Sequence, residues 1–134
     1  MSREEMNSAL NAHFVPALRQ RGFKGSLPHL RRQRESTVDL VTIQYDRHGG
    51  GFVVEISRCA VAGVTTHWGK HIPAKKATVY DIHPTLRHRL GASGLNSDHW
   101  FRFDQGVSAT VIAESLHAYV DEAERWWAAS ERPL

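Results

Sequence analysis

The sequence contains a single cysteine, Cys59, among its 134 residues. One cysteine excludes an intramolecular disulfide and a metal site built only from cysteines. The chain also lacks any apolar run near the roughly 20 residues that a membrane-spanning helix needs, and its start, MSREEMNSAL, has acids where a signal peptide has its apolar segment. We therefore expect a protein of the reducing cytoplasm that makes no contact with a membrane.

The composition indicates an ordinary globular protein. Apolar residues make up 41% of the chain and charged residues 23%, which is near the average for folded domains, so neither disorder nor a fibrous class is expected. A chain of this length has enough residues for one efficient core but not for two. We expect a single α+β domain over residues 1–134.

Charge is distributed unevenly along the chain. The net charge of +3 is too small to identify a nucleic-acid binder. Between Arg19 and Arg34, however, there are six basic residues and no acid, whereas from Val111 onward there are five acids and two arginines. This asymmetry predicts one basic face and one acidic face on the folded molecule.

The two ends of the chain have the apolar spacing of amphipathic helices. The first begins with a capping box, Ser2 and Glu5, and ends near Arg21, where Gly22 can adopt the left-handed conformation that follows many helices. One side of this helix is formed by five apolar residues and one histidine: Met6, Leu10, His13, Phe14, Ala17 and Leu18. The second helix has spacings of four, three, four and three residues across Ile112, Leu116, Tyr119, Ala123 and Trp126.

That second spacing also predicts which tryptophan is buried. Trp126 continues the apolar stripe and is expected in the core. Trp127 falls one step off the stripe, so it either widens the buried face or contacts another chain.

The segment between the helices predicts an antiparallel sheet. Strands are expected at residues 30–34, in TVDLVTIQY and in GFVVEISR, with further extended pieces in ATVYDI and HWFRF. Alternation in the third of these places Phe52, Val54 and Ile56 toward the helices, with Glu55 and Ser57 on the other face. We therefore predict an α+β fold: an antiparallel β-meander of about four to five strands, with an N-terminal and a C-terminal helix packed on one face.

The chain resembles a known bacterial family. The residues that carry the resemblance are GFK after the first helix, then LRR, IQYD, a glycine-rich turn, FVVEIS, DHWFRFD and the terminal helix. On these landmarks the chain is similar to the family named domain of unknown function 4304. The resemblance implies the same α+β fold and a bacterial cytoplasmic protein, and it carries over no catalytic residue.

Residues 65–91 hold four of the nine histidines. His67 and His71 are four residues apart, but Gly69 and Pro73 oppose a helix there, and Trp68 stands where a helical zinc-protease motif requires glutamate. The metalloprotease interpretation therefore fails, and we expect no metal and no cofactor. A site gathered from loops stays open, with these suitable ligands: Asp81, His83, His88, Asp98 and His99.

The same segment is rich in basic residues. Lys70, Lys75, Lys76, Arg87 and Arg89, alongside a basic strand over residues 31–34, predict a surface that binds polyanions weakly and in a salt-sensitive way. An alternative is that these residues form an ordinary solvated face. Trp68 or Trp100 can stack a base, pack in the core or contact a neighbouring arginine. The candidate ligand-binding residues are Arg31, Arg32, His67, Trp68, Lys70, His71, His83, Arg87, His88 and His99.

Motifs for covalent catalysis are missing. The glycines of GASGL do not match the spacing of a nucleophile elbow, and Cys59 beside Arg58 has the setting of a buried apolar residue. The sequence thus favours a binding or interaction module, whose partner is an anionic ligand or another protein, with no assignable catalytic residue. The alternative is a metal- or histidine-dependent hydrolase of a phosphorylated substrate, which should gather acids and histidines in one pocket. Either way the oligomeric state stays open.

Overall fold

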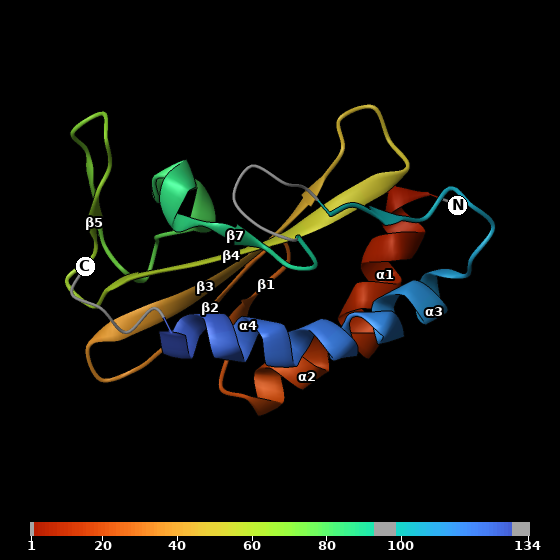
Figure 1. Ribbon diagram of the computed structural model, residues 1–134, viewed down its shortest axis with the longest axis horizontal. Helices are drawn as coiled ribbons and strands as arrows, with labels where there is room; N and C mark the ends of the chain where they lie inside the picture. The colour runs from red at the N-terminus through yellow and green to blue at the C-terminus, as the bar shows by residue number, and fades with distance from the viewer. Residues whose placement is uncertain (1, 93–98, 130–134) are drawn as a thin grey trace.

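The computed structural model describes residues 2–92 and 99–129. Its centre is an antiparallel sheet in the order β1-β2-β3-β4-β7, with β8 also paired to β4. Figure 1 shows the α-helices along one side of this sheet. This architecture confirms the predicted α+β meander with helices on one face. The strands are β1 (Lys24–Ser26), β2 (His29–Gln33), β3 (Thr37–Tyr45), β4 (Gly51–Ala60), β7 (His88–Arg89) and β8 (Phe101–Arg102).

The N-terminal helical segment consists of two helices, α1 (Arg3–His13) and α2 (Val15–Gln20), where one was predicted. The predicted capping box at the start of α1 is present. The break has a local cause: Pro16 has no backbone N–H to donate to the preceding turn, so it opens a second helix near its first position. Gly22 has the expected positive φ of 97° and ends the segment.

The C-terminal segment is also divided, into α3 (Ala109–Ser115) and α4 (His117–Ala129). The stripe predicted beyond Leu116 is confirmed in part, because Ala123 is buried and Tyr119 and Trp126 are half-buried against the main core. Trp127 is the buried tryptophan, with 2% of its surface exposed, and Trp126 is only half-buried. Trp126 is thus less buried than predicted, although it packs against the main core, and Trp127 widens the buried face, which is one of its two predicted alternatives. The indole Nε1 of Trp127 donates to the backbone oxygen of Ser57, 2.9 Å away.

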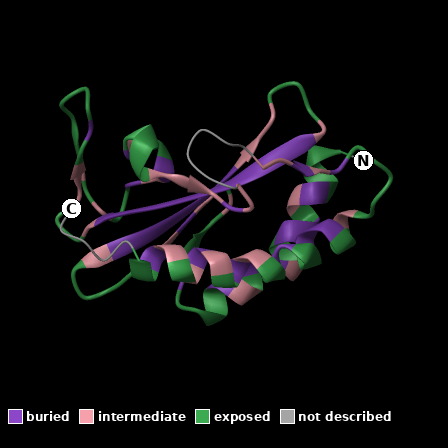
Figure 2. Ribbon diagram, in the orientation of Figure 1, coloured by how far each residue is buried: buried purple, intermediate pink, exposed green. Residues whose placement is uncertain are grey.

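The predicted register of β4 is confirmed. Phe52, Val54 and Ile56 belong to the main core beneath the helices, and Ile56 is 0% exposed against 4% for Glu55. Glu55 faces the opposite side, but it too is buried, because a second and thinner layer covers that side (Figure 2). The layer encloses a small core made of Val38, Leu40, Cys59, Ala77, Val79 and Ile82.

The second layer is built from short elements. They are a hairpin of β5 (Val64–Thr65) and β6 (His71–Ile72) and two 3-10 helices, η1 (Val79–Asp81) and η2 (Pro84–Leu86). The predicted strand in ATVYDI is wrong: the N–H of Thr78 donates to the Asp81 carboxylate at 2.8 Å, and this capping interaction favours a helical turn. The strand predicted in HWFRF is present as β8. Within residues 2–92 and 99–129, no helix has the length and apolarity to cross a membrane.

Candidate functional site

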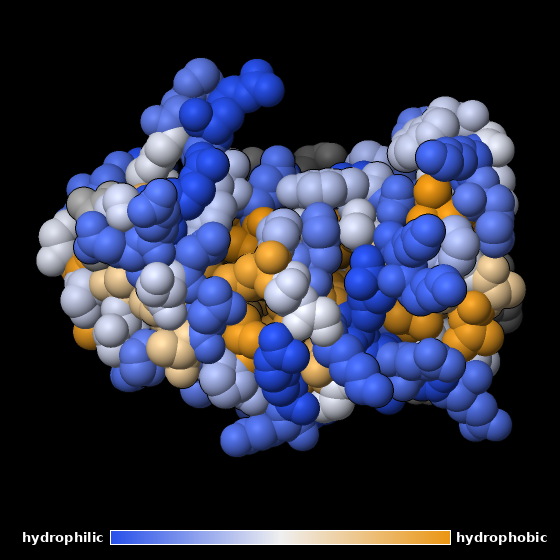
Figure 3. Space-filling view, turned by 180° about the vertical axis from the view of Figure 1, so that it is seen from behind, coloured by the Kyte–Doolittle hydropathy of each residue, from blue (hydrophilic) through white to orange (hydrophobic). Residues whose placement is uncertain are grey.

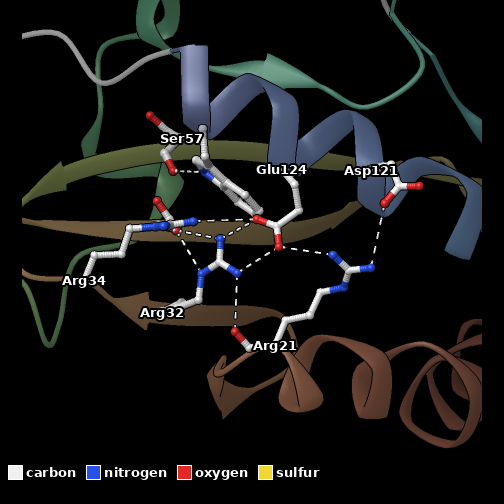
Figure 4. Close-up of polar contacts among 8 residues, drawn as sticks. Arg21, Arg32, Arg34, Ser57, Asp121 and Glu124 are labelled. Atoms are coloured by element: carbon white, nitrogen blue, oxygen red, sulfur yellow. Dashed lines mark hydrogen bonds and ion pairs between the residues drawn. The ribbon is translucent and has the colours of Figure 1, made fainter.

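Arg32, one of the predicted ligand-binding residues, is held by acids of the same chain (Figure 4). Its guanidinium donates to Asp39 at 2.9 Å and to Glu124 of α4 at 3.0 Å. It also lies over the rings of Phe23 and Trp127, at 4.6 and 5.2 Å from their centres. The Arg32 side chain therefore joins β2 to α4 and is not displayed to a ligand.

The same cluster corrects the expected charge distribution. Arg21 and Arg34 also pair with Glu124, and Arg21 reaches Asp121. The basic segment and the acidic segment thus meet within the fold, and these residues do not form separate basic and acidic faces. Figure 4 shows the arginines converging on α4 from the β2 side.

Arg87 and Arg89 are engaged on the opposite face of the sheet. The Arg89 Nε donates to one oxygen of Glu55 at 2.8 Å, and Arg87 pairs with the other at 3.4 Å. Arg87 also donates to the backbone oxygens of Ile82 and Tyr80. Arg89 further lies over the ring of Trp100, which is the arginine contact foreseen for a tryptophan. Both arginines neutralise a buried carboxylate, and Arg87 also holds the second layer on the sheet.

His88 and His99 lie against the helices, away from the other predicted histidines. His88 Nε2 is 2.7 Å from Glu122 of α4, and its ring stacks on Trp126. His99 contacts the rings of Phe101 and Tyr119 at centroid distances of 4.9 and 5.7 Å. These two side chains pack other elements onto α4. The potential ligand Asp98 and the serine of GASGL lie outside the described residues.

His67 and His83 do come together. They line a cavity of about 760 Å³, and their ring centroids are 5.8 Å apart at an interplanar angle of 76°. His67 belongs to the turn between β5 and β6, and His83 is the residue that caps η2. Trp68 contacts His67 edge-on at 4.8 Å and is 57% exposed, so packing in the core is wrong for this tryptophan.

The hydrogen bonds of His83 set its tautomer. Its Nδ1 accepts the backbone N–H of Thr85 at 3.2 Å and lies 2.7 Å from the Thr85 hydroxyl. In the neutral ring the proton must then be on Nε2, assigned from this network. His83 therefore keeps one N–H donor for another partner.

The rest of this histidine cavity is mostly apolar. It lies between the outer edge of β4, the β5–β6 hairpin, the 3-10 helices and the end of α4. Burial raises the pKa of the Cys59 thiol to about 11, outweighing the opposing effect of Arg31, so the thiol stays protonated. This confirms Cys59 as a buried apolar residue. The remaining lining residues are Arg58, Ala60, Val64, Thr65, Asp81, Ile82, Thr85, Leu86, Trp126 and Ala129.

Comparison with known proteins identifies the family. Residues 14–130 match the family described as Domain of unknown function (DUF4304). The chain belongs to this family. The match covers the whole sheet and every residue of the histidine cavity, and it confirms the resemblance seen in the sequence. No curated protein and no solved structure matches the chain.

The other predicted basic residues of this DUF4304 domain stay near the surface. Lys70 and His71 are exposed on the β5–β6 hairpin, and Arg31 is half-buried because its Nε donates to the Ala77 oxygen at 2.7 Å. Figure 3 shows that hydrophilic side chains cover most of the side behind Figure 1, with apolar side chains visible between them. The ten predicted residues therefore occupy several separate places and not one continuous patch.

Two residues that line the histidine cavity of the DUF4304 domain could not be predicted from its sequence. Arg58 and Leu86 line the histidine cavity, yet they belong to a strand and a 3-10 helix that no motif connects. Their proximity arises only from the tertiary fold. In the part of the chain that the structure describes, no three His, Cys, Asp or Glu side chains are grouped as metal ligands.

Proposed function

We propose that this DUF4304 domain is a binding module that holds a small organic anion in the histidine cavity. The observation that carries the proposal is that His67 and His83, from separate loops, line one cavity of about 760 Å³. That volume falls within the range of roughly 300–1,000 Å³ that small-molecule sites occupy, and such sites combine apolar walls with a few polar groups.

The polar groups of the cavity favour an anion. His83 offers its Nε2–H, and His67 adds a second imidazole to the lining. Arg58 lines the cavity as a buried residue, while one oxygen of Asp81 accepts the Thr78 N–H. Trp126 and Leu86 supply apolar surface for the body of the ligand. A carboxylate or phosphate joined to an apolar group fits this combination.

Binding of benzoate and phenyl phosphate tests the proposal, with benzyl alcohol as the uncharged probe. We expect both anions to shift the NMR signals of His67 and His83, and to bind more tightly than benzyl alcohol. The double variant H67A/H83A should lose about ten-fold or more in affinity, because charge-assisted hydrogen bonds contribute about 1.5–3 kcal/mol. His48→Ala is the matched control, since His48 is exposed on the β3–β4 turn. Equal binding of benzyl alcohol, or no binding of either anion, contradicts the proposal.

A second candidate function is hydrolysis of a phosphate ester by a histidine base. It is favoured by Asp81, which lines the same cavity as His67 and His83. His67 would take a proton from water as the water attacks phosphorus and the bond from phosphorus to the alcohol oxygen breaks, because Nε2 of His83 already carries a proton. Release of nitrophenol from p-nitrophenyl phosphate, lost in His67→Ala and kept in His48→Ala, would establish this activity. Absence of turnover together with anion binding leaves the binding module as the function.

A further inference from the structure

A second cavity, of about 230 Å³, lies on the same face of the sheet near its other edge. It is bordered by β1, β2 and the segment that follows β6, and we name it the lysine cavity. Three of its lining residues are cations and none is a carboxylate. The lining residues are Lys24, Gly25, Arg31, Gln33, Val38, Ala74 and Lys75.

The fold forces these cations together. Lys24 and Arg31 are direct partners in the antiparallel β1–β2 pair, so their side chains leave the same face of the sheet side by side. Like charges in that arrangement repel. The segment carrying Lys75 is fixed above them, because the Arg31 Nε donates to the oxygen of Ala77 at 2.7 Å and Ala77 is 0% exposed in the small core.

The charge of this cluster is not balanced as it is elsewhere in the chain. Arg32 and Arg34 pair with Asp39 and Glu124, and Arg87 pairs with Glu55. For the lysine cavity, no carboxylate of the described residues forms an ion pair with its three cations. An anion from outside would relieve the repulsion and would meet several donors at once.

We propose that the lysine cavity binds a phosphoryl group. Three cations match the two negative charges and three terminal oxygens of a phosphate monoester better than the single charge of a carboxylate. Gln33 adds a neutral amide donor. A cavity of this size suits one small oxyanion or the phosphorylated end of a larger molecule, whose remainder extends into solvent. The proposal is independent of the histidine cavity, which lies at the β4 edge.

Lys75 and Lys76 provide a matched test, because both are exposed and only Lys75 lines the cavity. Inorganic phosphate, titrated into the whole chain and followed by NMR and by the melting temperature, should bind wild type and Lys76→Gln equally. Lys75→Gln should weaken binding by about ten-fold or more. Lys24→Gln should melt at or above the wild-type temperature in phosphate-free buffer, since it removes the repulsion with Arg31, and should gain less from phosphate. Equal losses of phosphate affinity in Lys75→Gln and Lys76→Gln overturn the proposal, as does a wild-type chain that binds no phosphate.

Two further comparisons separate the sources of the anion and the two cavities. Glycerol 3-phosphate binding more tightly than inorganic phosphate identifies a phosphorylated organic molecule as the ligand, whereas equal affinity identifies free phosphate. The H67A/H83A variant should keep the full response to inorganic phosphate. Loss of that response would assign phosphate to the histidine cavity and would overturn this inference while supporting the proposed function.

Discussion

The two faces of the sheet are built in different ways. On one face, long helices cover the main core, and the charged cluster around Arg32 joins them to the strands. On the other face, two 3-10 helices and a short hairpin cover the small core (Figure 1). Both cavities border that second layer. Short elements with few apolar side chains leave hollows that helices would fill, so the helix face contributes most of the stability and the proposed binding sites lie on the opposite side.

Electrostatics follow the same division. Arginines on the helix face meet carboxylates from β3 and α4, which leaves little positive charge for a ligand. On the opposite face, Arg87 and Arg89 are matched by Glu55, but the cations of the lysine cavity have no such match among the described residues. Positive charges that the fold does not pair with its own carboxylates can interact with an anion from outside the chain.

The largest expected effect comes from replacing one buried isoleucine by alanine on each face of the sheet. Ile56→Ala removes a fully buried side chain from the main core and should lower the free energy of unfolding by about 3–5 kcal/mol. Ile82→Ala should cost about 2 kcal/mol or less, because Ile82 already borders the histidine cavity and its loss enlarges an existing space. Urea unfolding of both variants measures the difference. Equal losses would contradict the division of stability between the faces.

A smaller effect is expected for the ion pair that closes the helix face. The hydrogen bond from Arg32 lowers the pKa of the Glu124 carboxyl. Because the pKa is lower in the folded chain, the stabilisation is complete above the ordinary value of 4.5 and is lost as the pH falls through the folded value. Glu124→Gln should therefore cost about 1–2 kcal/mol at pH 7, with the difference from wild type vanishing in acid.

The control for that experiment is Glu114→Gln. Glu114 is 60% exposed and only 3.8 Å from His13, so its loss should change stability by less than about 0.5 kcal/mol. Urea unfolding at several pH values between 7 and 3 distinguishes the two glutamates. A Glu124→Gln penalty that persists unchanged at pH 3 would show that the charge of Glu124 is not its source.

Local patterns in the sequence predicted much of the fold. Strict alternation gave the register of β4, and the Ser2–Glu5 capping box gave the start of α1. Errors arose where one residue interrupts a regular pattern. Pro16 divides the first helix, and beyond the break at Leu116 the buried face includes Trp127 and leaves Trp126 only half-buried. A hydrophobic spacing extrapolated along the sequence does not show where a helix is interrupted.

The site was harder to predict than the fold, because it depends on which charges meet. The sequence places Arg32 next to Arg31, yet adjacent strand residues face opposite sides, so one binds acids under α4 and the other lines the lysine cavity. The acid that engages Arg32 is Glu124, far along the chain. Of the predicted histidines, only His67 and His83 share the histidine cavity, since each comes from a different loop that tertiary packing brings together.

The last expected effect concerns the reactivity of the Cys59 thiol, which is measured without changing the chain and is the most direct probe of the opposite face. With its pKa raised to about 11, this thiol is ionised in only about one molecule per thousand at pH 8. Iodoacetamide should therefore label it about a hundred times more slowly in the folded chain than in urea, where the pKa is near 9.0. Mass spectrometry of samples taken over time gives the rate.

Variants then show which motion exposes the thiol. If the second layer opens by itself, Ile82→Ala should speed labelling more than its loss of global stability accounts for, because local opening needs less free energy than unfolding. Ile56→Ala should speed labelling only in proportion to global unfolding. A ligand in the histidine cavity should slow the reaction, since Cys59 is part of its wall. Phenyl phosphate is the probe for this protection, and a rate that it leaves unchanged would place binding elsewhere on the molecule. Rapid labelling of wild type at pH 8, unaffected by either isoleucine, would mean that the β4 edge is open in the native state and that the two faces differ less than their packing indicates.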